Sequence, residues 1–341
     1  MVGWPIAPPV TRRGRTRGLQ TPMTVRLAVV MDPIGSIHYH KDTTLAMLWE
    51  AQARGWQIHY FEVPDLYVRD GRAYGRGRSL VVRRDPAHWF DWTNPAQEQA
   101  LAAFDVILMR KDPPFDQEYL YATYILEFAE TEGALIVNRP QALRDANEKL
   151  YLAQFPDCAP PLLVTSAHAR LIEFLDEHQD ILLKPLDAMG GSSVFRLRRA
   201  DPNVNVTIEM LTQRGARHIM AQRFLPEIAH GDKRILLIDG EPVPYALARH
   251  PKPGETRANL AVGGTYSGVE LSVRDRWLCA QLAPSLRSKG LLFVGIDVIG
   301  EFVTEINVTS PTCARELDAL YGINIAGQLL DAIASKLAAA R

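Results

Sequence analysis

Residues 181–198 read ILLKPLDAMGGSSVFRLR, and this stretch decides the fold class of the second half of the chain. Ile181–Pro185 and Ser193–Arg198 have the composition of strands, and a glycine-containing turn lies between them. Two strands joined by so short a turn pair antiparallel. The stretch therefore predicts an antiparallel hairpin, with Lys184 near the end of its first strand.

The glycine turn also has the chemistry of a phosphate site. Glycines let backbone N–H groups approach a phosphate closely, successive N–H groups form an anion-binding concavity, and Lys184 adds a positive charge. The stretch is not a Walker A loop, because no Gly-Lys-Ser/Thr opens a helix, and it does not match GxGxxG. An ordinary hairpin turn is the alternative, since short glycine motifs often occur without a ligand.

A second hairpin carries candidate metal ligands. Residues 297–307 read DVIGEFVTEIN, and strand periodicity places Glu305 and Asn307 on one face. Two oxygen ligands at this spacing suit Mg²⁺, which takes carboxylates, waters and phosphates. Asp297 joins them only if a three-residue turn or a bulge sets it opposite Glu305, and we predict that register. A solvated polar face is the alternative, but the apolar residues of the same strands indicate burial, and buried carboxylates need a partner.

The N-terminal half has a different pattern. Short apolar runs alternate with segments of helical spacing: runs at 25–31, 58–63, 106–109 and 134–138, and helices at 43–54 and 119–130. This order predicts a doubly wound α/β unit with a parallel sheet. Residues 67–84 are predicted to form a hairpin, with turns at Asp70-Gly71 and Gly75–Gly77.

The second half continues as antiparallel α+β structure. Further strands are predicted at 220–225, 235–238, 243–249, 291–299 and 302–308, followed by a C-terminal helix at 323–337. The fold class is therefore α/β plus α+β. We expect an N-terminal α/β domain at 24–146, a central subdomain with the glycine loop at 147–225, and a C-terminal subdomain with the metal site at 226–341.

Composition narrows the function classes. At 341 residues the chain suits two or three domains, and 47% hydrophobic with 23% charged residues is ordinary for a globular protein. The formal net charge of −1 gives no global attraction to nucleic acid or anionic membranes, and no apolar run has the ~18 residues of a membrane helix. Three distant cysteines without a CxxC pair favour a reducing cytoplasm.

The N-terminus is unusually basic. Residues 1–31 contain five arginines and no acidic residue, and four prolines oppose a helix there. We expect a disordered extension at residues 1–23. An upstream start codon, with Met23 as the true beginning, would equally explain it, and the composition also shares features with organelle transit segments.

A set of basic residues completes the candidates: Lys149, Arg234, Arg249 and Arg257. Arg257 belongs to a glycine- and proline-rich loop at 250–265. A long loop of this kind in a compact domain is a lid, a binding loop or disordered. Each arginine taken alone is as well explained as a surface charge.

These elements together resemble the ATP-grasp superfamily and, within it, the bacterial glutathione synthetase family. The motifs that carry the resemblance are MDP (31–33), VILMRKDPPFD (106–116), NEKL (147–150), LKPLDAMGGSS (183–193), GDKR (231–234), GETRANLAVGG (254–264) and TEINVTSPTCARE (304–316). They occur in family order at family-like spacing, from about Val25 to the C-terminus. The first 23 residues lie outside the resemblance.

The resemblance implies an ATP-grasp fold behind a Rossmann-like N-terminal domain, with ATP between two α+β subdomains and held by two strand lysines. The implied nucleotide-binding residues are Lys149, Lys184, Ala188, Met189, Gly190, Gly191, Gln222, Phe224, Leu225, Asp232 and Arg234. The implied metal ligands, for Mg²⁺ or Mn²⁺ in its place, are Asp297, Glu305 and Asn307. The implied catalytic residues are Arg234, Lys184 and Arg257, the last in the lid loop. Ala188 departs from the family pattern, which has glycine there.

The activity that the resemblance implies is ATP-dependent ligation of glycine to γ-glutamylcysteine through an acyl phosphate, in a cytoplasmic homotetramer without nucleic-acid or membrane partners. Such a reaction needs no protein nucleophile. Other ATP-grasp ligases, which join D-alanines or add amino acids to a protein tail, share the nucleotide motifs; MDP and RKDPPFD favour the glutathione family by resemblance. A non-catalytic nucleotide-binding module is the other alternative, and the retained basic and metal-binding positions argue against it.

Overall fold

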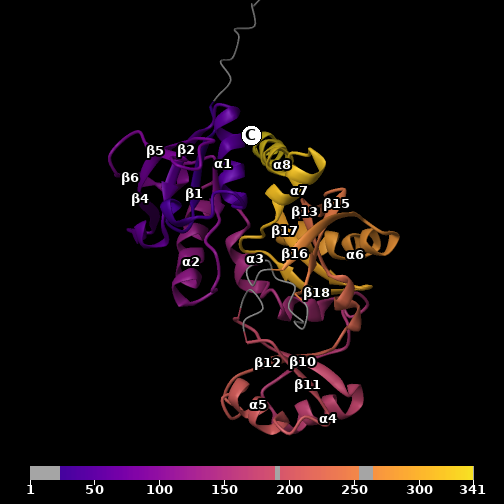
Figure 1. The fold of residues 1–341 in the computed structure, drawn as a ribbon. Coiled ribbons are helices and arrows are strands. Elements are labelled where there is room, and N and C mark those ends of the chain that lie inside the picture. Colours follow the sequence, from indigo (N-terminus) through magenta and orange to yellow (C-terminus); the bar gives the residue numbers. More distant parts are fainter. Residues whose placement is uncertain (1–23, 189–192, 253–263, 341) are drawn as a thin grey trace, which may run out of the picture.

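The computed structural model describes residues 24–188, 193–252 and 264–340. Within these residues the strands form three sheets, one each in the N-terminal, middle and C-terminal parts of the chain (Figure 1). The N-terminal and C-terminal parts lie side by side, and the middle part extends away from both. The predicted extension at 1–23 lies outside the described residues.

The N-terminal sheet is parallel at its centre, as predicted. Its parallel strands are β1 (Arg26–Val30), β2 (Gln57–Phe61), β7 (Val106–Met109) and β8 (Leu135–Val137), in the order β2-β1-β7-β8. Val29 shares a hydrophobic cluster with Leu45 of α1 (Thr43–Ala53), whereas Val30 shares one with Tyr119 of α2 (Gln117–Thr131). The two helices therefore cover opposite faces, which is why these strands read as continuous apolar runs.

An antiparallel extension continues this sheet beyond β2. It contains β3 (Leu66–Arg69), β4 (Arg72–Val82), β5 (Phe90–Trp92) and β6 (Gln97–Ala100), and α3 (Pro140–Asp145) ends the N-terminal part. The predicted turn at Asp70-Gly71 is confirmed, but the one at Gly75–Gly77 is wrong, because both glycines lie inside β4. A Cβ on Gly77 would lie 2.5 Å from the carbonyl oxygen of Tyr60 and 2.4 Å from the ring of Phe61. These glycines thus permit close strand approach instead of a turn.

The middle sheet is antiparallel. Its strands are β9 (Leu162–Thr165), β10 (Asp180–Pro185), β11 (Phe195–Arg198) and β12 (Ile219–Arg223), in the order β11-β10-β12-β9. Helices α4 (His168–His178) and α5 (Val204–Leu211) accompany it. β10 pairs with β11 as the glycine-turn hairpin predicts. A separate hydrophobic cluster, drawn from residues 171–221, holds this part together.

The C-terminal sheet has the order β16-β15-β13-β17-β18. Its strands are β13 (Asp232–Ile238), β14 (Glu241–Pro242), β15 (Tyr245–His250), β16 (Thr265–Glu270), β17 (Phe293–Ile299) and β18 (Phe302–Asn307). Its helices are α6 (Val273–Lys289), α7 (Ala314–Tyr321) and α8 (Ile325–Ala339). Asp239 and Gly240 form the turn between β13 and β14, and an Asp-Gly pair is typical of such a hairpin.

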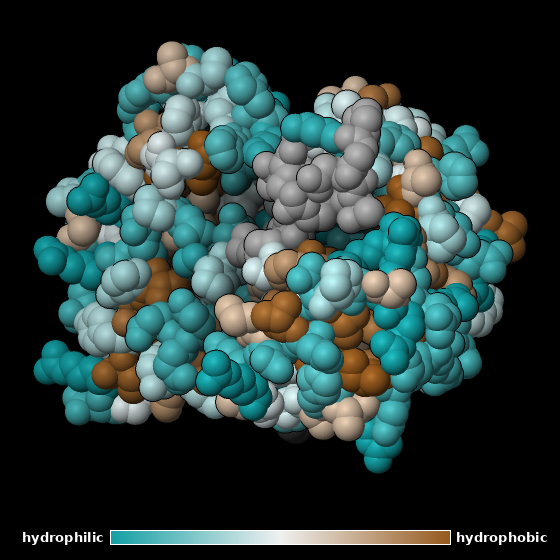
Figure 2. Space-filling model, turned by 60° about the horizontal axis from the view of Figure 1, so that its bottom comes forward, coloured by the Kyte–Doolittle hydropathy of each residue, from teal (hydrophilic) through white to brown (hydrophobic). Residues whose placement is uncertain are grey.

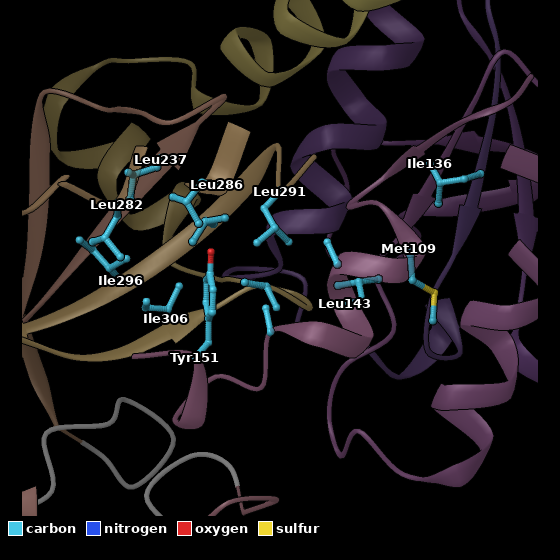
Figure 3. Packing of buried hydrophobic residues seen from close by; sticks show 14 of the residues in the cluster. Met109, Ile136, Leu143, Tyr151, Leu237, Leu282, Leu286, Leu291, Ile296 and Ile306 are labelled. Atoms are coloured by element: carbon cyan, nitrogen blue, oxygen red, sulfur yellow. The ribbon is translucent and has the colours of Figure 1, made fainter. Parts of the chain in front are cut away.

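The N-terminal and C-terminal parts share their hydrophobic cores. Figure 3 shows Met109, Ile136 and Leu143 continuing through Leu291 and Leu286 into the C-terminal sheet at Ile296. A buried amide reinforces this contact at one point: the Nδ2 of Asn138 donates to the carbonyl oxygens of Phe293 and Val308, each at 2.7 Å, and its Oδ1 accepts from Phe293 N at 2.9 Å. All the polar atoms of this side chain are therefore used within the interface.

The surface is mainly hydrophilic on the face that Figure 2 turns forward, where hydrophobic residues occur in small separate groups. No helix in the described part of the chain combines the length and apolar character needed to cross a membrane.

Candidate active site

A cavity of about 620 Å³ lies between the N-terminal and C-terminal parts. One wall comes from the segments that follow β1 and β7, and the other from β13, β15, β18 and the segment after β18. Its lining includes Asp32, Lys41, Asp42, Lys111, Asp112, Glu148, Arg234, Arg249, Glu305, Asn307, Ser310, Cys313 and Glu316. Two parts of the chain far apart in sequence thus contribute charged side chains to one space.

The predicted register of the metal hairpin is confirmed. Asp297 of β17 pairs directly with Glu305 of β18, and the ladder shifts between Asp297 and Val298. Ile299 pairs with Phe302, so the turn itself has two residues and Thr304 is the extra residue of a bulge. Without that bulge, Asp297 would face Thr304 and the carboxylates would lie on opposite sides of the sheet.

Four buried charges lie together on one face of the C-terminal sheet. Asp232 and Arg234 are two residues apart on β13, opposite Arg249 of β15 and Asp297 of β17, respectively. Arg234 donates to Asp297 through Nε at 2.5 Å and Nη2 at 2.9 Å, and Arg249 Nη2 reaches Asp297 at 3.0 Å and Asp232 at 2.5 Å. All four residues are buried. Mutual pairing makes the burial of these charges tolerable.

The two acids of this network have opposite electrostatic environments. Burial raises the pKa of Asp232 to about 6, although Arg249 opposes the rise. Burial would also raise the pKa of Asp297, but Arg234 and Arg249 outweigh it and hold that pKa below its usual range. Asp232 Oδ1 and Arg249 Nε have no hydrogen-bond partner among the described residues. Asp297 is therefore a fixed anion, whereas Asp232 is poised between two charge states.

Lys149 lies beside the metal hairpin. It precedes a short 3-10 helix, η4 (Leu150–Gln154), so its predicted position on a strand is wrong. The neighbouring backbone still pairs with β18, because Ile306 N donates to the carbonyl oxygen of Glu148 at 2.8 Å. Lys149 Nζ donates to Glu148 and to the carbonyl oxygen of Ala188, the latter at 2.6 Å, and lies 3.9 Å from Glu305 Oε1. Burial alone would lower its pKa, but these carboxylates outweigh burial and raise it.

Lys184 lies on β10, as predicted, and is buried. Its Nζ donates to Gln222 Oε1 at 2.9 Å, across the β10–β12 pair. Burial lowers the pKa of Lys184, and the charge of Glu305 acts in the opposite direction. Gln222 is 1% exposed and its Nε2 has no partner among the described residues. A buried donor without a partner is costly, so it indicates a missing acceptor.

The residues after β12 continue this wall. Phe224 and Leu225 directly follow the strand, and Arg196 of β11 stacks over the Phe224 ring at 3.4 Å from its centroid. Phe224 N also donates to the carbonyl oxygen of Asp180, at 3.0 Å. This segment therefore has a fixed backbone at the edge of the middle sheet, next to Gln222.

The donor set at the metal hairpin fits a hard divalent cation. Glu305 and Asn307 line the same cavity, and Asn307 Nδ2 lies 3.5 Å from Asp297 Oδ2. Burial, and then the charge of Glu305, raises the pKa of Glu148, so a cation bound nearby would favour its charged form. Oxygen donors of this kind suit Mg²⁺ or Mn²⁺. In the described ranges no three His, Cys, Asp or Glu side chains gather as a metal site, and the third side chain here, Asn307, is an amide.

Several predicted site residues lie outside the described residues: Met189, Gly190, Gly191 and Arg257, with most of the loop 250–265. Ala188 is the last described residue before the glycine loop, and its carbonyl oxygen is the atom that Lys149 contacts. Lys149 therefore contacts the chain at the residue where the glycine loop begins.

The sequence did not lead us to the residues that the N-terminal part contributes to the cavity wall. Lys111 Nζ pairs with Asp32 at 2.8 Å, Asp112 N donates to Asp32 at 2.8 Å, and Ser310 Oγ donates to Asp112 at 2.5 Å. β2 and β7 lie on opposite sides of β1, so the crevice beyond β1 and β7 is the topological switch point where such sheets bind ligands. The sequence did contain a signal, since Asp32 and Lys111 lie within two residues of the ends of two strands predicted to be parallel.

Two family profiles match the chain over most of its length. "Prokaryotic glutathione synthetase, N-terminal domain" matches residues 25–144, and "Prokaryotic glutathione synthetase, ATP-grasp domain" matches residues 148–322. Among curated proteins, the glutathione synthetases of Pseudomonas aeruginosa and Salmonella typhimurium are 59% and 55% identical to the chain, over 317 and 314 residues. These alignments cover 93% and 92% of this chain and 100% and 99% of the relatives.

Solved structures show the same fold at low identity. A D-cycloserine synthetase superposes with a TM-score of 0.65 at 15% identity, covering 91% of this chain and 99% of its own. An ATP-grasp ligase from Chryseobacterium gregarium superposes with a TM-score of 0.61 at 14% identity, covering 92% and 97%. The predicted ATP-grasp fold is thereby confirmed. With both of its domains matched in order and relatives aligned almost end to end, the chain belongs to the prokaryotic glutathione synthetase family.

Proposed function

We propose that the chain joins glycine to the C-terminal carboxyl group of γ-glutamylcysteine at the expense of ATP, giving glutathione, ADP and phosphate. The observation that carries this proposal is the shared cavity. It places Arg234, Arg249 and Glu305, which suit phosphoryl chemistry, opposite the charged segments after β1 and β7. A peptide carboxylate and a phosphoryl group can therefore meet in one cavity.

The nucleotide is assigned to the space between the middle and C-terminal sheets. Lys149 and Lys184 supply positive charge for its phosphates, and the glycine loop from Ala188 to Gly191 supplies backbone N–H groups. Gln222 has an unused Nε2 donor beside Phe224 and Leu225, which suits recognition of a base edge. Asp232 is kept as a nucleotide-binding residue, and its pairing with Arg249 also holds that arginine in place.

Glu305 and Asn307 are assigned as metal ligands, with Asp297 as the third oxygen donor on the same face. When bound there, Mg²⁺ or Mn²⁺ neutralises charge on phosphoryl oxygens. Asp297 is already engaged by two arginines, so its part includes fixing Arg234 in the cavity wall. Lys149 keeps Glu305 in place from the other side.

The chemistry proceeds in two steps. A carboxylate oxygen of the peptide attacks the γ-phosphorus of ATP, ADP leaves, and an acyl phosphate forms. The amine of glycine then attacks the acyl carbon, phosphate leaves, and the amine loses a proton. Arg234 and Arg249 stabilise the negative charge that gathers on the transferred phosphoryl group, because they are fixed before the reaction and cost no reorganisation. Arg257, in the loop 250–265, is assigned to closing the cavity against water.

The reaction uses no protein nucleophile. Cys313 does line the cavity, but burial raises the pKa of its thiol and keeps it protonated. A thiol that stays protonated is a poor nucleophile, which agrees with activation of the carboxyl group through phosphate.

Further properties complete the proposal. We assign domain limits at 24–146, 147–225 and 226–341, a cytoplasmic location consistent with three unpaired cysteines, and a homotetrameric assembly. Nucleic acid and membranes are not among the proposed partners.

The test measures phosphate release by the full chain with ATP, Mg²⁺ and γ-glutamylcysteine, with and without glycine. We expect release that depends on glycine, together with formation of glutathione. Replacing γ-glutamylcysteine by D-alanine tests the alternative of another ATP-grasp ligase. Release with D-alanine alone, or none with the glutathione precursors, would refute the proposal.

A further inference from the structure

A second pocket, of about 370 Å³, lies at the edge of the N-terminal sheet and shares no lining residue with the active-site cavity. It is lined by Tyr60, Glu62, Asp65, Arg76, Gly77, Arg78, Trp92 and Ala96. None of these residues has a part in the reaction proposed above. We call it the β4 pocket, because Arg76, Gly77 and Arg78 are consecutive on that strand.

The β4 pocket has one basic side. Arg76 and Arg78 are two residues apart on a strand, so their side chains leave the same face. Arg78 stacks over the Trp92 ring at 5.2 Å from its centroid. Among the described residues neither arginine has an ion-pair or hydrogen-bond partner, in contrast to the arginines of the active-site cavity. Two guanidinium groups are thus free to receive a carboxylate.

The opposite side of the pocket is acidic. Glu62 accepts a hydrogen bond from the hydroxyl of Tyr60 at 2.7 Å, and Asp65 accepts one from Glu62 N at 2.8 Å. These bonds fix both carboxylates while leaving lone pairs unused, and no cation pairs with either of them in the part of the chain that the structure describes. The pocket therefore presents two positive and two negative groups, which cancel in the sum.

The floor of the pocket is rigid. Tyr60 is 5% exposed and its ring packs 5.1 Å from that of Trp92. Gly77 lets β4 lie directly against β2 at this point, because a Cβ there would collide with the carbonyl oxygen of Tyr60. A preformed aromatic floor lowers the entropic cost of binding a small ligand.

We propose that the β4 pocket binds a zwitterionic amino acid or short peptide. Its carboxylate pairs with Arg76 and Arg78, and its ammonium group pairs with Glu62 and Asp65. A simple anion such as phosphate fits less well, because it would face the two carboxylates without compensation. The chemical class includes the substrates and product of the proposed reaction, so the choice of probes rests on that function.

The β4 pocket contacts the wall of the active-site cavity. Ile34 N donates to the hydroxyl of Tyr60 at 3.2 Å, and the Nε1 of Trp89 donates to the carbonyl oxygen of Ile34 at 2.9 Å. Trp89 in turn reaches Trp92 through Phe90, with ring centroids 6.1 and 5.1 Å apart. Ile34 directly follows Asp32 and Pro33, which line the cavity. The β4 pocket is therefore connected, through Tyr60 and Ile34, to the segment that lines the active-site cavity.

The test uses titration calorimetry of the full chain with glutathione, γ-glutamylcysteine and glycine as separate probes. For at least one of them we expect a second class of binding besides the active site. The double variant Arg76→Ala/Arg78→Ala should weaken that class at least tenfold and leave turnover at saturating substrate unchanged. Arg72→Ala is the matched control, since Arg72 lies on the same strand face and outside the pocket, and it should retain both classes.

Glu62→Gln separates a zwitterion from an anion. It keeps the side-chain shape and removes the charge, so it should weaken the second class. The proposal is wrong if no probe gives a second class, if the double variant binds like the wild type, or if inorganic phosphate binds and gains affinity in Glu62→Gln. If the double variant keeps its turnover, the proposed function holds whether or not the β4 pocket binds a ligand. Failure of the pocket proposal can therefore be distinguished from failure of the proposed function.

Discussion

Asp297 and Glu305 are directly opposite each other across the β17–β18 hairpin, and the bulge at Thr304 is what aligns them. The alignment joins two charge systems. Asp297 is held by Arg234 and Arg249, whereas Glu305 lies beside Lys149. One hairpin thus connects the arginines assigned to phosphoryl stabilisation with the oxygens assigned to the metal.

Glu305→Gln should abolish most turnover with little effect on folding. The substitution keeps the side-chain shape but removes the charge that a divalent cation needs, and we expect kcat/KM to fall about 100-fold or more. The measurements are glutathione formation as a function of Mg²⁺ concentration and Mn²⁺ binding by electron paramagnetic resonance. Glu301→Gln, at the exposed turn of the same hairpin, is the control. Normal Mn²⁺ affinity in Glu305→Gln would contradict the assignment.

Arg234→Met should destabilise the fold as well as stop catalysis. It leaves Asp297 buried with one cationic partner in place of two, and breaking a buried pair costs about 3–5 kcal/mol. We expect a loss of unfolding free energy at the lower end of that range, because Arg249 remains paired with Asp297. Urea unfolding measures the effect. Arg287→Met, which removes an exposed pair with Glu241, should cost less than about 1 kcal/mol, and equal losses in both variants would contradict the buried network.

Asp232 should make stability depend on pH in a direction unusual for a carboxylate. Its pKa is raised from the ordinary value of 3.8 to about 6 in the folded state. The folded protein therefore holds this proton more tightly than the unfolded chain does. The stability that this provides is complete below pH ~4 and is lost as the pH rises through about 6.

Asp232→Asn removes that dependence. The difference in unfolding free energy, variant minus wild type, should increase between pH 4 and pH 7.5 by roughly 1–3 kcal/mol. Comparing the two proteins at each pH cancels the contributions of groups outside this network. Asp297 lies within it, but its lowered pKa keeps it ionised in the folded state over this pH range. A difference that is constant or falls over this range would refute the prediction.

Gln222→Ala should weaken nucleotide binding. The variant loses the buried acceptor of Lys184 and the donor assigned to the base, so we expect the Kd for ATP to rise about tenfold, corresponding to roughly 1–2 kcal/mol. Calorimetry with ATP measures it, and the affinity for γ-glutamylcysteine should hardly change. Gln213→Ala, on an exposed turn, is the control. An unchanged Kd for ATP would remove Gln222 from the nucleotide site.

Sequence patterns predicted the parallel character of the N-terminal sheet and the register of one hairpin. The parallel strands β1, β7 and β8 and the register of Asp297 against Glu305 are confirmed, since buried strands must place their apolar residues inward. The glycines of β4 led to a wrong prediction of a turn. Gly75 and Gly77 are needed because the ring of Phe61 packs against them. A local sequence pattern cannot reveal a contact with a residue fourteen or more positions away.

The candidate site was predictable only in part for the same reason. Strand spacing is local, so it places Glu305 with Asn307. The pairing of Arg249 with Asp232 and the approach of Ser310 to Asp112 depend on how distant segments meet. The strand position expected for Lys149 failed because a 3-10 turn brings the backbone to β18 instead.

The hydrogen bonds of the Asn138 amide influence the order in which parts of the molecule unfold. It fastens the first sheet to the third, and the two larger hydrophobic clusters each contain residues of both parts. The middle sheet has a cluster of its own. In amide hydrogen exchange we therefore expect the two ends of the chain to be protected as one cooperative unit, and the middle sheet to exchange as a second, separate unit.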